Sequence, residues 1–150
     1  MAYHREVGID TRIIRIFNTY GPRQLARAVI PTIISQALAE SKVHLGNLKP
    51  TRDFNYVSDT ISGLLSLALC QKAEGEVVNI GSGEEWSIGE TAQLLCEIVD
   101  RKIDIVSDES RVRPVNSEVN RLLADNSKIR SLTGWKSQTS FKKGLKSTVE

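Results

Sequence analysis

The sequence has few cysteines, histidines and aromatic residues, and it contains no long apolar run. The 2 cysteines and 2 histidines are scattered along 150 residues, so no group of them has the spacing of metal ligands. Cys70 and Cys96 lie in separate amphipathic helical patterns, which indicates reduced thiols of a cytosolic protein and not a disulfide pair. No apolar stretch approaches the length of about 18 residues that a membrane helix requires, and no signal peptide is recognisable. We therefore expect a soluble cytoplasmic chain without a membrane partner.

An excess of charge of one sign is also missing. The net charge is +2 and there is no long basic run, so the electrostatic footprint of a nucleic-acid-binding protein is absent. Hydrophobic residues make up 40% of the chain, which is enough for a core. The length predicts one domain or a piece of a larger protein.

What is present is a strongly apolar stretch that leads into a polar turn, Arg15-Ile-Phe-Asn-Thr-Tyr-Gly-Pro-Arg23. The near-continuous apolar run over residues 11–17 predicts a strand buried on both faces of a parallel sheet. Ligands of such sheets bind at the carboxyl ends of the strands, where Asn18 is expected. An amide there, followed by a turn and an arginine, favours an anionic, hydroxyl-rich ligand. The alternative is a strand that ends only because Gly21-Pro22 forms a turn.

The remaining pattern mixes helices and strands throughout. Residues 2–9 resemble the end of a helix that Gly8 terminates. An alternating strand is predicted over residues 51–57, and Ser58 or Asp59 can cap the helix after it. Further helices are predicted around Pro31, after the capping box Ser87 to Glu90, after Asn126 and after Ser140, and short strands over 43–45, 76–80 and 103–106. The helix after Asp59 carries an apolar stripe of Ile61, Leu64, Leu65, Ala68 and Leu69.

Four arginines fall in predicted loops or at strand ends, namely Arg23, Arg52, Arg111 and Arg113. Arginine forks bind phosphate oxygens through paired hydrogen bonds, and a diphosphate requires more than one such donor. For any one loop arginine, a solvated charge or a surface ion pair is the commoner explanation. Arg52 is the strongest candidate because it adjoins Asp53 at the start of a half-buried strand.

Several stretches together resemble the extended short-chain dehydrogenase/reductase family that contains NAD-dependent nucleotide-sugar epimerases and dehydratases. They occur in the family's order and cover nearly the whole chain: Arg15 to Gln24, Val29 to Pro31, Leu45-Gly46 with Thr51 to Asp59, Val78 to Gly83, Arg113-Pro114, and Asp125 to Ile129 with Gly134-Trp135. The details look most like the 4,6-dehydratases of UDP-N-acetylglucosamine or GDP-mannose.

The resemblance implies an α/β fold made of two parts. Residues 1–24 would be the C-terminal strand region of a Rossmann-type NAD(P)-binding sheet. Residues 25–150 would form the small mixed α/β substrate-binding domain, with short returns to the Rossmann core. The ligand would be a UDP-, GDP- or dTDP-linked sugar, the cofactor NAD, and the full-length family member a homodimer.

The resemblance also implies a role for individual residues. Asn18 would hold the diphosphate or the sugar, and Arg52 and Arg113 would bind phosphate. Glu118 would accept hydrogen bonds from the ribose hydroxyls. The remaining positions would surround the nucleotide: Val29 through its backbone, Val43, His44 and Leu45 around the base, and Asn79 nearby.

Two elements of the family are missing from the chain. No Gly-x-Gly-x-x-Gly fingerprint opens a strand–helix unit, and Gly81-Ser-Gly83 is interpreted as a turn. None of the three tyrosines has a lysine four residues later. No catalytic residue is therefore assigned, most of the NAD site would lie outside the chain, and whether it is an enzyme is left open. The expected function is the nucleotide-sugar-binding portion of such an enzyme, inactive alone; the alternatives are a non-catalytic truncated paralogue acting as a binding module, or an α/β domain without a ligand.

A stability expectation follows from the first strand. If its sheet neighbours are absent, its four large apolar side chains stay in water, at a cost of roughly 1.5–3 kcal/mol each. That sum rivals the stability of a whole domain. We expect a marginal chain that dimerises or aggregates unless a partner covers the strand, and a compact, stable monomer in size-exclusion chromatography would contradict this.

Overall fold

A computed structural model describes residues 2–112 and 118–150 of the chain. The elements follow in the order α1 (Ala2–Val7), β1 (Ile13–Ile16), β2 (Asn18–Tyr20), α2 (Val29–Ala39), β3 (Lys42–Leu45), β4 (Thr51–Arg52), β5 (Phe54–Tyr56), α3 (Val57–Ala68), β6 (Val77–Ile80), β7 (Trp86–Ser87), α4 (Ile88–Val99), β8 (Asp104–Ser107), β9 (Arg121–Leu122), α5 (Ser127–Thr133) and α6 (Phe141–Val149). Short 3₁₀ turns cover Gln71–Ala73 and Glu109–Arg111. The predicted α/β class is confirmed.

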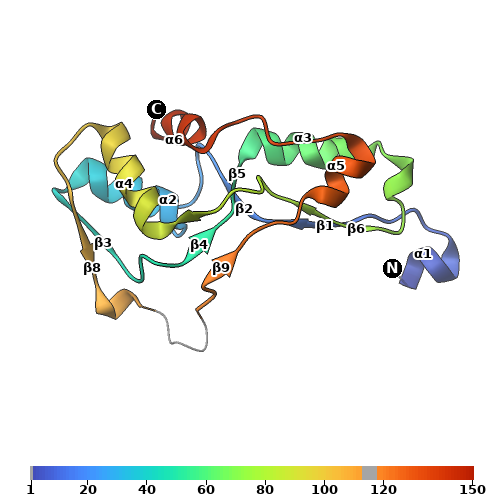
Figure 1. Cartoon of the computed structure of the whole chain (residues 1–150), viewed down its shortest axis with the longest axis horizontal. Coiled ribbons are helices and arrows are strands. Elements are labelled where there is room, and N and C mark those ends of the chain that lie inside the picture. Colours follow the sequence, from blue (N-terminus) through green and yellow to red (C-terminus); the bar gives the residue numbers. More distant parts are fainter. Residues whose placement is uncertain (1, 113–117) are drawn as a thin grey trace.

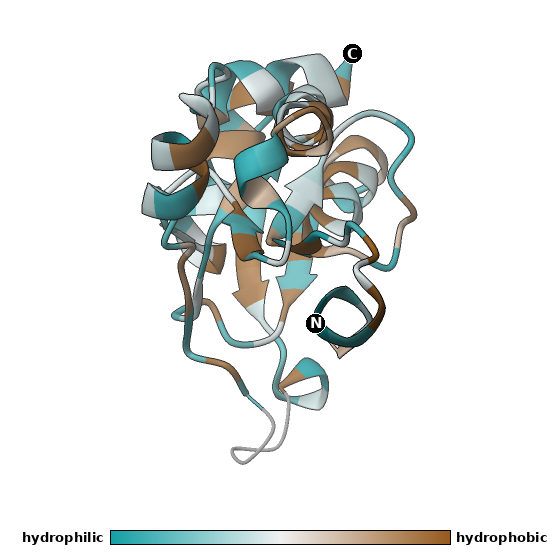
Figure 2. Cartoon of the chain, turned by 90° about the vertical axis from the view of Figure 1, so that its right-hand side faces the viewer, coloured by the Kyte–Doolittle hydropathy of each residue, from teal (hydrophilic) through white to brown (hydrophobic). Residues whose placement is uncertain are grey.

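The strands form small sheets that are mostly parallel. β1 pairs with β6, β2 with β5 and β3 with β8, each in parallel. β4 lies between β7, which runs antiparallel to it, and β9, which runs parallel. In Figure 1, α3 and α5 lie above the β1–β6 pair, while α2, α4 and α6 gather toward the other end of the molecule. Figure 2 shows the molecule from the β1–β6 end, with most helices on one side of the strands.

Each end of the molecule has its own hydrophobic core. One core lies among α2, α4, α6 and β3, and includes the fully buried Ile33, Leu95 and Leu145. The other lies among α3, α5 and β6, and includes Leu67 and Ile80. The strands β2, β4 and β5 lie in the middle of the molecule, between the two cores (Figure 1).

The strand expected over residues 11–17 is shorter than predicted, because β1 covers only Ile13–Ile16 and a separate strand, β2, begins at Asn18. The chain changes partner at Phe17, whose N–H still donates to Ile80 O at 2.9 Å before β2 joins β5. Asn18 therefore lies just beyond the carboxyl end of β1, where the sequence placed it, and it also opens the second strand, β2. β1 is also not buried on both faces, because Ile13 and Ile16 are 39% and 48% exposed. This is the exposure expected for a strand that lacks a neighbour.

The helix α3 has the predicted position but buries a different face. Its buried side carries Thr60, Gly63 and Leu67, whereas Ile61, Leu65 and Leu69 of the predicted apolar stripe are exposed. Gly63 explains the choice, because a Cβ there would lie 3.2 Å from side-chain atoms of Ile80 and Trp135. The missing side chain lets α3 approach β6 closely.

The predicted cap of α3 is also corrected. Tyr56 precedes the helix, and it provides no side-chain cap. Asp59 instead lies buried in the first turn, where its carboxylate accepts hydrogen bonds from Ser137 Oγ and Thr139 N, both at 2.9 Å. Asp59 therefore links α3 to the segment before α6 through two hydrogen bonds.

The capping box of α4 is confirmed. Glu90 N donates to Ser87 Oγ at 3.0 Å, and Ser87 N donates back to the Glu90 carboxylate at 2.8 Å. The hydrogen bond from the Ser87 hydroxyl, and then that from its amide, lower the pKa of Glu90. Among the residues that the structure describes, no helix is both long and apolar enough to cross a membrane.

Gly144 of α6 packs directly against the aromatic centre of the molecule. A Cβ at this position would overlap the Tyr20 hydroxyl and lie 2.9 Å from Tyr56 Cδ2. We expect Gly144→Ala to destabilise the fold by about 1–3 kcal/mol through overpacking, although alanine favours helices by about 1 kcal/mol. Urea denaturation measures the change, with Lys143→Ala on the exposed side of α6 as control. Equal stability of the two variants would contradict the packing argument.

Candidate functional site

The structure contains a cavity of about 360 Å³ in the middle of the molecule. It opens where β2, the start of α2, the end of β3 and the β4–β5 segment meet, and the start of α4 closes one side. Its lining consists of Asn18, Thr19, Tyr20, Gln24, Arg27, Ala28, Val29, Ile30, Leu45, Gly46, Asn47, Pro50, Arg52, Phe54, Ile88, Arg111 and Glu118. The cavity thus combines an apolar part with several cationic and amide side chains.

Arg52 is the most firmly placed cation of the cavity. It ends β4, whose two neighbours pair it with Trp86 on one side and Leu122 on the other. Its Nη1 donates to Thr51 O at 2.8 Å, and its Nη2 lies 3.4 Å from Glu118 Oε1. Both side chains of this ion pair are only 14% exposed. Because water screens it little, this guanidinium interacts strongly with an anion. Its hydrogen bonds to Thr51 and Glu118 also fix its orientation before a ligand binds.

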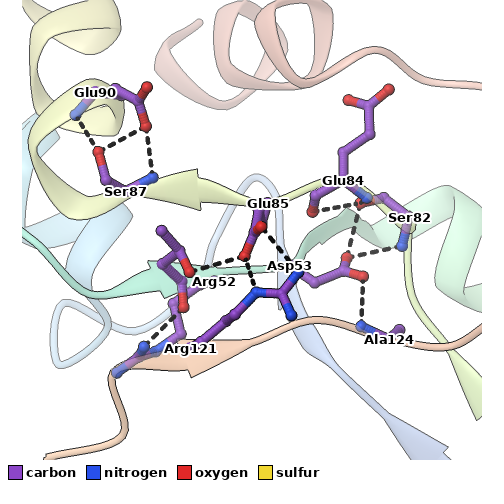
Figure 3. Close-up of polar contacts among 10 residues, drawn as sticks. Arg52, Asp53, Ser82, Glu84, Glu85, Ser87, Glu90, Arg121 and Ala124 are labelled. Carbon is purple, nitrogen blue, oxygen red and sulfur yellow. Dashed lines mark hydrogen bonds and ion pairs between the residues drawn. The ribbon is translucent and has the colours of Figure 1, made fainter.

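The next residue, Asp53, anchors the backbone that carries Arg52 (Figure 3). Its carboxylate is fully buried and accepts hydrogen bonds from Ser82 N, Ser82 Oγ, Gly83 N and Ala124 N at 2.7–3.1 Å. The strand prediction placed Asp53 and Asn55 on the polar side of an alternating strand. That prediction was wrong, because both are completely buried. Adjacent strand residues point to opposite sides, so Arg52 reaches the cavity while Asp53 holds the segments behind it.

Two more arginines bring positive charge to the cavity. Arg27 is exposed beside the start of α2, and Arg111 lies 3.4 Å from Asp108. Hydrogen bonds from Ser110 and then the charge of Arg111 lower the pKa of Asp108, so this carboxylate stays ionised and partly neutralises Arg111. In the described lining, three arginines face one carboxylate, Glu118. The balance favours an anionic ligand.

Tyr20 lies in the cavity wall but is unsuited to proton transfer. It is almost completely buried, and its hydroxyl donates to Phe141 O at 3.2 Å. Burial is the main cause that raises the pKa of Tyr20, followed by the charges of Tyr56 and Asp59. The phenol therefore stays protonated at neutral pH, in line with the absence of a lysine four residues later.

Five of the residues singled out by the sequence meet in this cavity: Asn18, Val29, Leu45, Arg52 and Glu118. Their individual roles stay predictions. Three others do not line it. Val43 is buried in the core, the His44 backbone N–H donates to Gln36 Oε1 at 2.9 Å, and Asn79 on β6 donates to Asp125 O at 3.2 Å. Arg113 lies outside the described residues.

Sequence reasoning missed several lining residues. Gln24 donates from Nε2 to Thr19 O at 2.9 Å and so holds the chain just after β2. Arg27 reaches the cavity from the turn before α2 and Ile88 from the start of α4, and no local pattern marks either of them. Arg111 was noticed as one of four loop arginines, whereas Arg23 of the same group does not line the cavity.

The glycine-rich turn of the chain is not a phosphate-binding loop. The glycine-rich turn Gly81-Ser-Gly83 has the amides of Ser82 and Gly83 committed to Asp53, so they cannot cradle a phosphate. The turn also packs tightly, because a Cβ on Gly81 would lie 2.7 Å from the Asp53 carboxylate. No group of His, Cys, Asp or Glu in the described part could hold a metal ion.

Comparison with known proteins identifies the family. The family model described as GDP-mannose 4,6 dehydratase matches residues 1–148. UDP-glucuronic acid decarboxylase 2 of Arabidopsis thaliana is 34% identical over 152 residues, which are 97% of this chain and 32% of that protein. The chain is 30% identical to the epimerase Mth375 of Methanothermobacter thermautotrophicus with a TM-score of 0.89, covering 99% of this chain and 44% of the other.

A third relative adds the ligands of a solved structure. UDP-glucuronic acid 4-epimerase from Bacillus cereus, in complex with UDP-glucuronic acid and NAD, is 30% identical with a TM-score of 0.88. It covers 99% of this chain, and the match is 46% of its own length. The chain thus spans about a third to a half of the relatives it matches. It belongs to the GDP-mannose 4,6-dehydratase family of NAD-dependent nucleotide-sugar epimerases and dehydratases, as its motifs predicted.

Proposed function

We propose that this chain is the nucleotide-sugar-binding portion of an NAD-dependent epimerase or dehydratase and is inactive alone. The observation that carries the proposal is the desolvated Arg52–Glu118 pair in the wall of a cavity of about 360 Å³. In our proposal Arg52 binds the diphosphate and Glu118 accepts from the ribose hydroxyls. The apolar residues Leu45, Pro50 and Ile88 cover the base, and Asn18 meets the diphosphate or the sugar.

In this proposal the chain binds the substrate, while catalysis and most NAD binding belong to the rest of the fold. The described residues offer a cavity for a nucleotide sugar, but Tyr20 is held protonated and the glycine turn is committed to Asp53. NAD, when bound in the whole enzyme, would supply the hydride chemistry. The domain division at residue 24 and the homodimer, which the resemblance implies, and the cytoplasmic location expected from the composition are part of this proposal.

A thermal melt of the purified chain with UDP, dTDP, GDP, UDP-N-acetylglucosamine or NAD tests the proposal. A ligand at a hundredfold excess over its Kd stabilises the folded state by about 2.7 kcal/mol, which corresponds to a rise of about 5–10 °C for a chain of this size. We expect that rise with at least one nucleotide and none with NAD. A rise with NAD alone, or a cooperative melt that no nucleotide shifts, would contradict the proposal.

The non-catalytic paralogue remains the second candidate function. It predicts the same nucleotide response, because it uses the same cavity. The two differ in the whole protein: restoring the Gly-rich fingerprint and the Tyr-x-x-x-Lys pair by attaching the rest of the family's fold yields turnover of a UDP-, GDP- or dTDP-sugar only under the first candidate. Product analysis by chromatography distinguishes them.

A further inference from the structure

A polar network joins β2, β5 and the start of α3, and the nucleotide proposal gives it no role. Asn55 Nδ2 donates to Thr60 Oγ1 at 2.8 Å, and Thr60 Oγ1 lies 3.0 Å from Thr19 Oγ1. Asn55 is fully buried and Thr60 is 5% exposed. We call these three side chains the Thr60 network. They need an explanation, because burial of polar groups opposes folding unless hydrogen bonds compensate for it.

The Thr60 network links two strands through one hydroxyl group of a helix. Thr19 and Asn55 are register partners in the parallel β2–β5 pair, so their side chains lie on the same face of the sheet. Because Asn55 Nδ2 donates to Thr60, the hydroxyl hydrogen of Thr60 is free to donate to Thr19 Oγ1. The Thr19 hydroxyl then reaches Phe17 O at 3.4 Å. The network therefore ends at the residue where the chain leaves β6 and joins β5.

Asn18 is the cavity residue that this network supports. Successive residues of a strand point to opposite sides, so Thr19 faces α3 while Asn18 and Tyr20 face the cavity that they line. Asn18 is exposed, so the backbone of β2 determines where its side chain lies. Thr19 is held a second time, because Gln24 Nε2 donates to its carbonyl oxygen at 2.9 Å. Both contacts fix the residue next to Asn18.

The composition of the Thr60 network is not the one that stability alone would favour. Asn55 Oδ1 is buried and has no hydrogen-bond partner in the part of the chain that the structure describes. An unpaired buried acceptor opposes folding, and apolar side chains of similar shape at all three positions would avoid this penalty. A polar group that is kept in spite of the penalty indicates a function.

We propose that the Thr60 network positions Asn18 for ligand binding by fixing β2 at the point where the chain leaves β6. Thr19, Asn55 and Thr60 are positioning residues in this inference, since they act on the ligand through Asn18. The ligand part of the inference rests on the nucleotide proposal, whereas the positioning of β2 does not.

Replacing the whole network with apolar side chains separates positioning from stability. The variant combines Thr19→Val, Asn55→Leu and Thr60→Val, which roughly preserve shape. We expect its thermal midpoint to stay equal or to rise, because the removed groups pair mainly with one another. Its affinity for UDP-N-acetylglucosamine, measured by calorimetry, is expected to fall about 3–30-fold, as when a residue acts through its neighbours. A purely structural role gives the opposite result, with a lower midpoint and an unchanged affinity.

Single variants provide the matched comparisons. Thr60→Ser keeps the central hydroxyl and is expected to keep the affinity, whereas Thr60→Val removes it and is expected to weaken binding about as much as the triple variant. This pair decides the question even if the triple variant does not fold. Thr148→Val removes a hydroxyl of α6 that donates to Gly144 O at 2.7 Å and lies outside the network, so it is expected to leave the affinity unchanged.

A measurement on the unliganded chain tests the positioning itself. NMR relaxation dispersion of the backbone amides of residues 18–20 reports motion on the μs–ms timescale. We expect exchange broadening of these amides in Thr60→Val and not in Thr60→Ser, with β3 unchanged in both variants. If the native chain binds no nucleotide, the nucleotide proposal fails, and this measurement still decides whether the network positions β2.

Three results would overturn the inference. The first is identical relaxation of residues 18–20 in Thr60→Val and Thr60→Ser. The second is a Thr60→Val variant that binds UDP-N-acetylglucosamine as tightly as the native chain does. The third is a further loss of affinity when Thr60→Val is added to Asn18→Ala. Because the network acts through Asn18, the double variant is expected to bind no more weakly than Asn18→Ala alone.

Discussion

Asp53→Asn is expected to destabilise the fold by about 3 kcal/mol or more, although it removes no volume. One carboxylate oxygen accepts from Ser82 N and Ser82 Oγ, and the other from Gly83 N and Ala124 N. An asparagine keeps one acceptor and turns an NH₂ group toward two donors. Each buried donor left unpaired costs about 1–3 kcal/mol.

The surroundings of Asp53 prevent relaxation. A Cβ on Gly81 would overlap Ala124 Cβ, so the three segments meet without spare space for a water molecule or a rotated amide. Urea denaturation with an unchanged m-value measures the loss. Asp104→Asn on the exposed side of β8 makes the same charge change without a buried network and is the control. A difference below about 1 kcal/mol between the two variants would show that the network contributes little.

The local elements were predictable because their signals are local. The capping box at Ser87 and Glu90, the helix end at Gly8 and the strand over residues 43–45 are all where the sequence placed them. Each depends on residues within a few positions of one another. The family, and with it the α/β fold, followed from motifs whose order and spacing span the whole chain.

Burial of polar residues was not predictable in this way. Asp53 and Asn55 alternate with aromatic residues, which normally indicates a polar face. The partners of Asp53 are 29, 30 and 71 residues away, so no local pattern announces them. The prediction of the buried face of α3 was wrong for a related reason. Gly63 carries no hydrophobic side chain that a pattern could detect, yet it determines which side of the helix approaches β6.

The candidate site shows the same division. Asn18, Leu45 and Arg52 were found because they belong to recognisable motifs, and they do line one cavity. Arg27, in the turn before α2, and Ile88, at the start of α4, enter it only because α2 and α4 pack on each other, which no local pattern reveals. Val43 and Asn79 were implied by the same family resemblance but do not line the cavity, since a resemblance places a backbone segment and not each of its side chains.

Arg52→Met is expected to weaken binding of UDP roughly 10–100-fold, because a charge-assisted hydrogen bond contributes about 1.5–3 kcal/mol. The expectation rests on the nucleotide proposal and on the orientation of Arg52 by Thr51 O and Glu118. Isothermal titration calorimetry measures the affinity. Arg130→Met, which removes an exposed charge from α5, is the control for the change in net charge.

Glu118→Gln separates the two roles of the ion pair. With Glu118 neutral, Arg52 is released from its partner at 3.4 Å, and a ligand phosphate no longer has to displace a carboxylate. Inorganic pyrophosphate, which has no ribose, is therefore expected to bind at least as tightly as before. UDP is expected to bind several-fold more weakly, because the amide is a poorer acceptor for two ribose hydroxyls. If UDP and pyrophosphate weaken by the same factor, Glu118 acts only by positioning Arg52, and the ribose must be held by another residue of the cavity.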